Sequence, residues 1–254
     1  MRVLVCIKRV PAPGVRIVIT PDGQAIDTAH LGFTMSPHEE CAVEEAVLIT
    51  ERMGGEATVL TMGPEDAEEQ LRYALSLRVH HAVHVVTETT DWDPQRTAAA
   101  IAEAIASTEA EDGPFDLVLF GNESADSGGF QVGIRVAHAL GRPMVNGIKN
   151  LVFTDGVVTA RRAFDGGFEE YRLPLPAMVG VKEGINLPRY PTLRGRLLSK
   201  RAKVAQLETT ASPGGQTKLE LLPTKEEISE PIILGHGPEA APKVVEILAE
   251  LGVL

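Results

Sequence analysis

Short apolar runs alternate with longer amphipathic segments through residues 1–141 of this chain. The apolar runs are MRVLVCIKRV, EATVLTMG, HAVHVV and FDLVLFG. Such alternation predicts parallel strands that are joined by right-handed helical crossovers. We therefore expect a doubly wound, mainly parallel α/β sheet of the Rossmann-like kind, in which ligands lie beyond the carboxyl ends of the strands.

The clearest helix start follows the first strand, in the stretch MSPHEECAVEEAVLITERMGG. Ser36 is expected to cap the helix, and Pro37 suits its first position. Glu39 lies three residues after the serine and completes a capping box. Gly54 and Gly55 then end the helix, so we predict a helix that begins at residue 37.

The pattern changes after residue 141. Asp-Gly and Asp-Gly-Gly turns separate alternating runs over residues 148–181, which predicts added antiparallel hairpins. Residues 196–208 are basic and are expected to be partly helical. A linker at residues 209–218 leads to a tail that ends in a helix and has little of its own to pack against.

Charge and cysteine content exclude several classes of protein. The net charge of -11 argues against a nucleic-acid binder, because contacts with phosphates need a surplus of Lys and Arg. Cys6 and Cys41 are too few for a disulfide framework or a four-ligand iron cluster, and they favour a reducing, cytoplasmic location. No apolar run reaches the ~20 residues that span a bilayer, so we expect no membrane insertion.

The loop FGNESADSGGFQVG, residues 120–133, has the features of an anion site. Its glycines allow close approach of backbone N–H groups, and the helix that we expect from Gly128 presents unpaired donors in its first turn. The loop matches neither G-x-G-x-x-G nor the P-loop, and it lacks the Asp and Ser of the S-G-G-x-D-[ST] loop of pyrophosphate-releasing ATP enzymes. From these residues alone, nucleotide binding and a simple tight turn at Gly128 and Gly129 both stay open.

No group of residues indicates catalysis. The histidines of HHAVHVV belong to an apolar strand or its rim, and no metal-ligand spacing joins His30 and His38. The chain has no G-x-S-x-G elbow, and Cys6 in a buried strand is expected to be inert. The residues therefore predict a nucleotide-binding module that is not an enzyme and holds no metal.

Residues 182–203 are basic within an acidic chain. They hold seven Lys and Arg residues against a single acid, Glu183. Pro188 and Pro191 constrain a loop that carries Tyr190 and Leu193. One interpretation is a solvated basic helix after a turn. The other is a docking loop, in which an apolar anchor enters a partner's pocket and the charges steer an acidic surface.

Three stretches together resemble one family. They are KRVPAP, MSPHEECAVEEAV and INLPRYPTLRGRLLSKRAK. Over essentially its whole length the chain resembles the beta, or small, subunit of an electron transfer flavoprotein. The resemblance implies a heterodimer with an alpha subunit that holds most of a redox-active FAD, and a structural AMP in the beta subunit. It also implies electron transport from flavin-dependent dehydrogenases of the acyl-CoA type, as in fatty acid oxidation, to an acceptor such as a quinone oxidoreductase.

The resemblance also assigns residues and segments. The implied cofactor-binding residues are Cys6, Ser36, His38, Glu39, Met62, Gly121, Asn122, Asp126, Gly128, Gly129, Phe130, Gln131 and Val132. The phosphate is expected on N–H groups of residues 129–132, and Leu193, near Tyr190, is expected to insert into a pocket of the dehydrogenase. The implied division is a nucleotide-binding α/β domain at 1–185, a partner recognition loop and basic helix at 186–205, and a linker, C-terminal arm and helix on the alpha subunit at 206–254.

Several positions depart from the family pattern. His38 and Pro13 stand where members place aromatic residues near the flavin ring, and Val132 replaces a hydroxyl that contacts the AMP phosphate in some relatives. The charge of a histidine there would bear on the flavin potential. AMP, a second FAD as in bifurcating members, and an empty site therefore stay open. A stand-alone nucleotide sensor of universal-stress type and an ATP-dependent enzyme are rivals that leave the arm and the PRYPTLRG loop without a role.

Overall fold

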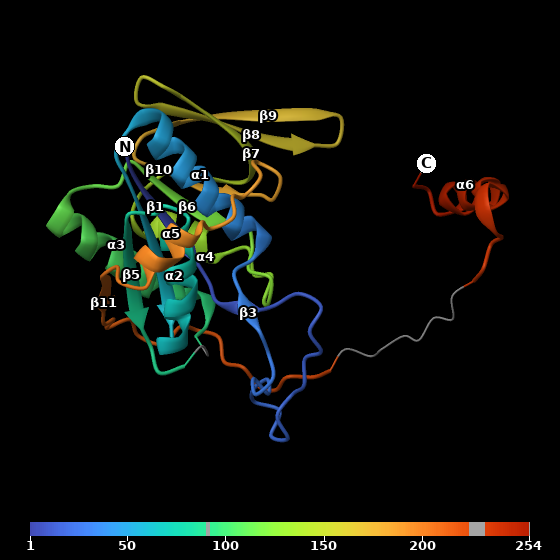
Figure 1. Cartoon of the computed structure of the whole chain (residues 1–254), viewed down its shortest axis with the longest axis horizontal. Helices are drawn as coiled ribbons and strands as arrows, with labels where there is room; N and C mark the ends of the chain where they lie inside the picture. Colours follow the sequence, from blue (N-terminus) through green and yellow to red (C-terminus); the bar gives the residue numbers. More distant parts are fainter. Residues whose placement is uncertain (90–91, 224–231, 254) are drawn as a thin grey trace.

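A computed structural model of the chain describes residues 1–89, 92–223 and 232–253 (Figure 1). The main sheet has the order β11-β5-β4-β1-β6-β10-β7-β8-β9. Its strands are β1 (Arg2–Ile7), β4 (Glu56–Gly63), β5 (His81–Val86), β6 (Leu117–Gly121), β7 (Met144–Thr154), β8 (Val157–Phe164), β9 (Gly167–Pro174), β10 (Ala177–Val181) and β11 (Val204–Leu207). The short strands β2 (Val10–Pro11) and β3 (Phe33–Thr34) pair separately.

Helices cover both faces of this sheet. Helices α1 (Pro37–Met53), α2 (Glu68–Ser76) after the 3₁₀ turn η1 (Glu65–Ala67), α3 (Pro94–Asp112) and α4 (Val132–Ala139) pack on the sheet. Two further helices are α5 (Leu193–Ser199), which contacts α2, and α6 (Ala241–Glu250), which follows η2 (Gly237–Ala240). The capping box predicted for α1 is present, with Ser36 and Glu39 bonding reciprocally. No helix in the described ranges is long and apolar enough to cross a membrane.

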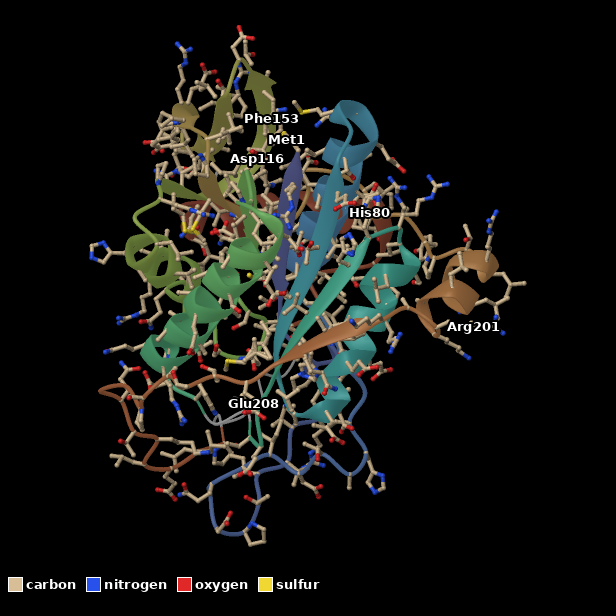
Figure 2. The ribbon with its side chains drawn as sticks, turned by 90° about the vertical axis from the view of Figure 1, so that its left-hand side faces the viewer. Met1, His80, Asp116, Phe153, Arg201 and Glu208 are labelled. Atoms are coloured by element: carbon tan, nitrogen blue, oxygen red, sulfur yellow. The ribbon has the colours of Figure 1, made fainter. Side chains whose placement is uncertain are left out.

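The strands from β11 to β7 run parallel, and β8 and β9 are antiparallel additions at one edge. This arrangement confirms the predicted doubly wound α/β class. The chain steps from β1 outward to β4 and β5 and then crosses back to β6 on the other side of β1. The strand order therefore reverses between β1 and β6, which is where ligands bind in such sheets. Glu208 marks the carboxyl end of the parallel strands, and Met1 and Asp116 mark the amino end (Figure 2).

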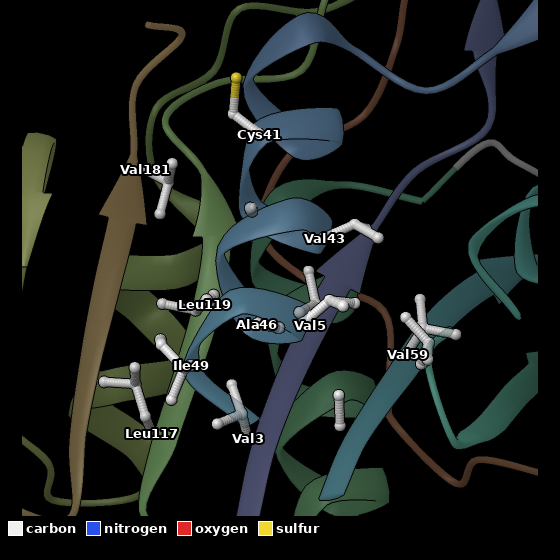
Figure 3. Packing of buried hydrophobic residues seen from close by; sticks show 14 of the residues in the cluster. Val3, Val5, Cys41, Val43, Ala46, Ile49, Val59, Leu117, Leu119 and Val181 are labelled. Carbon is white, nitrogen blue, oxygen red and sulfur yellow. The ribbon is translucent and has the colours of Figure 1, made fainter. Parts of the chain in front are cut away.

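The apolar run of β1 supplies two separate cores because successive side chains of a strand point to opposite faces. Val3 and Val5 pack in the cluster that includes α1 and α2 (Figure 3). Leu4 and Cys6 pack in the other cluster, against α3 and α4. Burial on both faces explains why this strand is continuously apolar rather than alternating.

The hairpin prediction holds for β7, β8 and β9. Asp155 and Gly156 both have positive φ, 45° and 75°, as a two-residue hairpin turn requires. The last run of that stretch differs, because β10 inserts between β6 and β7 and runs parallel to both. All five residues of β10 are buried, and a wholly apolar strand belongs inside a parallel sheet rather than at a hairpin edge.

Two other expectations need correction. Helix α4 begins at Val132 rather than at Gly128, because Gly128 and Phe130 adopt positive φ values of 53° and 52° that no helix accommodates. The segment 196–208, expected to be partly helical, is helical as far as Ser199, where α5 ends, but residues 204–207 form β11 and pair with β5. The boundary that we expected at residue 205 therefore falls inside a strand of the main sheet.

The chain after β11 first contacts the α/β domain, whereas its last helix lies away from that domain. Thr209 and Thr210 bond the carboxylate of Glu103, and Leu221 N donates to Gly23 O over 2.8 Å. No residue of α6 is buried, and Figure 1 draws this helix apart from the sheet. Residues 224–231 and 254 of the expected C-terminal arm lie outside the described residues.

Candidate functional site

A cavity lies over the point where the strand order reverses. Its walls come from the carboxyl ends of β1, β4 and β6 and from the first turns of α1, α3 and α4. The predicted residues that line it are Cys6, Glu39, Met62, Gly121, Asn122, Gly129, Phe130, Gln131 and Val132. The fold thus gathers residues that are far apart in the sequence into one pocket.

The other four predicted residues lie beside the cavity rather than in its wall. Ser36 caps α1, and Asp126 forms an ion pair with Lys8, with 2.7 Å between Lys8 Nζ and Asp126 Oδ2. Both Ser36 and Asp126 line a second hollow, together with Pro13 and other apolar residues of the loops that flank β2 and β3. Gly128 is exposed and makes the turn of the loop.

His38 is held by both of its ring nitrogens. Nδ1 accepts a hydrogen bond from Glu183 N over 2.7 Å. Nε2 lies 3.3 Å from Glu123 Oε1, so it carries the proton and donates. The ring therefore links the start of α1 to the loops after β6 and β10.

The loop from Gly121 to Gln131 is folded against the end of β1. Asn122 N donates to Val181 O over 2.8 Å, and Gly128 N donates to Ser124 O over 3.0 Å. The Lys8–Asp126 ion pair connects the middle of the loop to the residue after β1. These bonds fix the loop immediately before α4 begins.

The first turn of α4 has the donors of an anion site. Its first helical bond runs from Arg135 N to Gln131 O, so the three preceding N–H groups have no partner within the helix. Gln131 does not cap the helix, because its side chain accepts from Arg135 Nε instead. Uncapped donors and the helix dipole together favour a negatively charged ligand at this end of the cavity.

Glu39 places a buried carboxyl in the cavity wall. Burial raises its pKa to about 7, although a hydrogen bond from Ser36 N opposes the rise. Burial, with the nearby Glu39 charge, also raises the pKa of the Cys6 thiol. A thiol with a raised pKa is a poor nucleophile, which agrees with the expectation that Cys6 is inert.

The raised pKa of Glu39 predicts a pH-dependent stability. Its folded-state pKa exceeds the value near 4.5 expected in the unfolded chain, so the folded chain binds this proton more tightly. The tighter proton binding adds stability, of the order of 3 kcal/mol in the free energy of unfolding. This added stability is fully present below about pH 4.5 and is lost as the pH rises through about 7. Glu39→Gln keeps the capping geometry without this charge. Its melting temperature relative to the wild type should rise between pH 5 and pH 8, and a constant difference would contradict the assignment.

Lys8, Arg9 and Trp92 are among the cavity residues that the sequence analysis did not predict. The Arg9 guanidinium lies 3.4 Å from the centre of the Phe33 ring, and the Trp92 ring stacks with Arg96 at 3.6 Å. Lys8 and Arg9 directly follow β1, so the rule that ligands lie beyond strand ends pointed to them. Trp92 precedes α3, and no motif marks it.

Residues 186–203, here called the recognition segment, cross one face of the sheet between β10 and β11. Tyr190 and Leu193 are 90% and 77% exposed, and Leu197 and Leu198 are also exposed. Within the described residues no ion pair engages the surrounding cations, which are Arg194, Arg196, Lys200, Arg201 and Lys203. An apolar group with unpaired positive charge around it fits the predicted docking surface better than a purely solvated helix.

A parallel sheet whose strand order reverses, with a pocket at the carboxyl ends of its strands, is typical of Rossmann-like α/β binding proteins. The family description "Electron transfer flavoprotein domain" matches residues 25–212. The chain belongs to the electron transfer flavoprotein family, and its similarity to relatives named subunit beta identifies it as a beta subunit. Such a subunit implies an alpha-subunit partner and a flavin associated with the heterodimer.

Three relatives illustrate the similarity, and all are named electron transfer flavoprotein subunit beta. One from Bacillus subtilis (strain 168) is 31% identical over 256 residues, covering 98% of this chain and 97% of the relative. One from Mycobacterium tuberculosis (strain ATCC 25618 / H37Rv) is 33% identical over 211 residues, covering 81% and 78%. One from Oryza sativa subsp. indica, whose name adds "mitochondrial", is 32% identical over 212 residues, covering 82% of each chain.

Proposed function

We propose that this chain is an electron carrier subunit that binds a structural AMP and helps an alpha subunit to enclose its FAD. The observation that carries the proposal is the cavity at the strand reversal, with the uncapped first turn of α4 at one end. The chain has no catalytic role in this proposal. The flavin supplies the chemistry when it is bound, and the residues of this chain help to hold and orient the cofactors.

The cavity residues fit AMP. The N–H groups of residues 129–132 and the following turn suit a phosphate, because no side chain caps them. The Lys8–Asp126 ion pair and the side chain of Gln131 keep the loop in place around it. Met62 and Phe120 form an apolar part of the cavity wall. Val132 offers no hydroxyl, so in this proposal the backbone rather than a side chain contacts the phosphate.

The second hollow supports a contact with the alpha-bound FAD. It is mainly apolar, and Pro13 and Pro37 line it near the start of α1. His38 follows Pro37, and its ring nitrogens are committed to Glu183 and Glu123. We propose that His38 contributes to the flavin surroundings from this fixed position, so its substitution would alter the flavin potential.

The recognition segment is the proposed contact with a flavin-dependent dehydrogenase of the acyl-CoA type. Leu193 would enter an apolar pocket of that dehydrogenase, and the unpaired cations would steer an acidic surface toward it. Electrons would then pass to the heterodimer and onward to an acceptor such as a quinone oxidoreductase. We propose a cytoplasmic location for this exchange.

The chain beyond β11 is the proposed arm on the alpha subunit. Its described part exposes large apolar residues, among them Leu219, Ile232, Ile233 and Leu251. Helix α6 has an apolar side, and the described part of the chain buries none of its residues. A partner subunit that covers these residues would remove a patch that is unfavourable in water.

The cofactor content of the heterodimer tests the proposal. Denaturing the co-purified heterodimer and separating the released cofactors should give one FAD and one AMP. Two FAD and no AMP would favour the alternative, in which a second FAD occupies the cavity of a bifurcating type of beta subunit. A stable homodimer of this chain alone, without flavin, would instead favour the adenine-nucleotide sensor of universal-stress type.

A further inference from the structure

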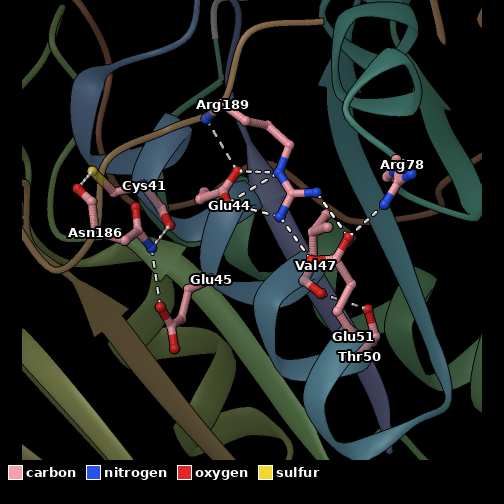
Figure 4. A network of polar contacts seen from close by, with 9 residues as sticks. All are labelled: Cys41, Glu44, Glu45, Val47, Thr50, Glu51, Arg78, Asn186 and Arg189. Carbon is pink, nitrogen blue, oxygen red and sulfur yellow. Dashed lines mark hydrogen bonds and ion pairs between the residues drawn. The ribbon is translucent and has the colours of Figure 1, made fainter. Parts of the chain in front are cut away.

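An ion-pair network attaches the start of the recognition segment to α1 (Figure 4). The Arg189 guanidinium bonds Glu44 through Nε and Nη2, with distances of 2.9 to 3.1 Å. It also bonds Glu51 through Nη1 and Nη2, at 2.8 and 2.9 Å. Glu44 and Glu51 are seven residues apart, so they share one face of the helix. The two carboxylates form a receptor for the planar fork of an arginine.

The network is charged and partly buried. The Glu44 side chain is only 5% exposed, and that of Arg189 is 27% exposed. Arg78 adds a second cation on Glu51, at 2.9 Å, so two cations face two carboxylates. Hydrogen bonds from Arg189 and Arg78 lower the pKa of Glu51 to about 2, which keeps the network ionised at neutral pH.

Asn186 extends the attachment toward the end of β10. Its Nδ2 donates to Cys41 O and to Glu45 Oε2, both over 3.0 Å. The backbone N of Arg189 donates to Glu44 over 3.2 Å. The chain is thus bound to α1 at two points immediately before the exposed Tyr190.

A second arginine holds the far end of the segment. Arg72 of α2 donates through Nη1 to Ser199 O and Ala202 O, over 2.5 and 2.6 Å. These carbonyl groups lie at and just beyond the end of α5, where carbonyls lack helical partners. Between the two arginines, a Cβ at Gly195 would lie 2.3 Å from Ser76 O. Only glycine allows α5 to lie this close to the end of α2.

We propose that Arg189 is a positioning residue for docking: with Arg72, it fixes α5 and presents Leu193 before a dehydrogenase arrives. Both ends of the segment are tied to α1 and α2, whereas the large side chains of Tyr190, Leu193, Leu197 and Leu198 between them are exposed. A surface that is already ordered loses less conformational freedom on binding, so it binds more tightly. The inference rests on the proposed docking role of Leu193.

The heterodimer with Arg189→Lys tests this inference. Lysine keeps the positive charge beside Glu44 but cannot bond two carboxylates as a planar fork. With an acyl-CoA dehydrogenase that reduces the wild-type heterodimer, the KM for the heterodimer should rise about three- to tenfold at unchanged kcat. Amide hydrogen exchange in residues 190–198 should accelerate at least about tenfold.

Arg142→Lys is the matched control. Arg142 Nη2 bonds both oxygens of Glu109 at 2.7 Å, and both side chains are at least as buried as Arg189. This variant alters a comparably buried arginine–carboxylate ion pair away from the recognition segment, so its KM should stay at the wild-type value. FAD content and reduction by dithionite should match the wild type in both variants.

The variant Leu193→Ala distinguishes failure of docking by Leu193 from failure of positioning by Arg189. If Leu193→Ala raises KM and Arg189→Lys does not, positioning by Arg189 is wrong while docking by Leu193 stands. If Arg189→Lys raises KM no more than Arg142→Lys does, the inference is likewise overturned. If Leu193→Ala itself leaves KM unchanged, the docking function fails, whatever Arg189 does to hydrogen exchange.

Discussion

Replacing Leu193 with alanine should reduce kcat/KM for reduction of the heterodimer by its dehydrogenase about 30-fold. Leu193 is 77% exposed on a segment that is fixed at both ends, so its side chain is available to a partner pocket. Truncating an anchor at the centre of an interface costs about 2 kcal/mol or more, which corresponds to this factor. Steady-state reduction with an acyl-CoA dehydrogenase measures it.

The same variant should leave assembly and FAD content intact, because Leu193 does not line the cavity and precedes the proposed arm in the chain. Leu219→Ala, on the chain beyond β11, is a useful comparison, since Leu219 is 85% exposed but lies on the proposed contact with the alpha subunit. It should affect assembly rather than reduction by the dehydrogenase. Unchanged kcat/KM in Leu193→Ala would show that the recognition segment does not dock through this side chain.

Replacing Gly121 with alanine should lower the AMP content of the heterodimer at least about tenfold. The added Cβ would lie 2.7 Å from Glu39 Cγ and 3.3 Å from Glu39 N. Gly121 ends β6 and Glu39 lies in the first turn of α1, so the clash separates two walls of the cavity. Overpacking of this kind costs about 1–3 kcal/mol, and the displaced walls no longer fit a nucleotide. Chromatography of the denatured heterodimer measures the AMP released.

Gly32→Ala controls for the loss of a glycine as such. A Cβ there would meet Ala12 Cβ at an ordinary 3.8 Å, so AMP content should stay at the wild-type level. Thermal unfolding of both variants, with and without added AMP, separates loss of the site from loss of the fold. A Gly121→Ala heterodimer that retains one AMP would rule out the cavity as the nucleotide site.

The parts of the fold that follow from repeated patterns could be predicted from the sequence. The strands β1, β4, β5 and β6 are apolar because helices cover both faces, and the capping box at Ser36 fixes the start of α1. The location of β10 depends on which strands it pairs with, which a short apolar run does not encode. Residues 204–207 form an edge strand with mixed exposure, so they show neither the alternation of a half-buried strand nor the continuous apolar run of a buried one.

The candidate site was predictable where backbone chemistry dictates the residue type. Glycines beyond a buried strand mark the loop at residues 121–133 without any knowledge of its contacts. The Lys8–Asp126 ion pair joins residues that are 118 positions apart, and the cavity residue Trp92 belongs to another loop. Their proximity depends on the packing of several crossovers, which local sequence rules do not reach. Arg189 was noted as one of seven cations, and only its tertiary contacts distinguish it from the rest.

The pairing of β11 with β5 gives the recognition segment two ends in the same sheet. Residues 182–203 are therefore an insert between two strands, and the segment does not depend on the arm that follows for its location. An insert of this kind can be exchanged as one block between relatives that keep Glu44, Glu51 and Arg72 on the underlying helices. If the proposed docking role holds, the choice of electron donor can then change during evolution while the proposed nucleotide pocket, which other strand ends build, is left untouched.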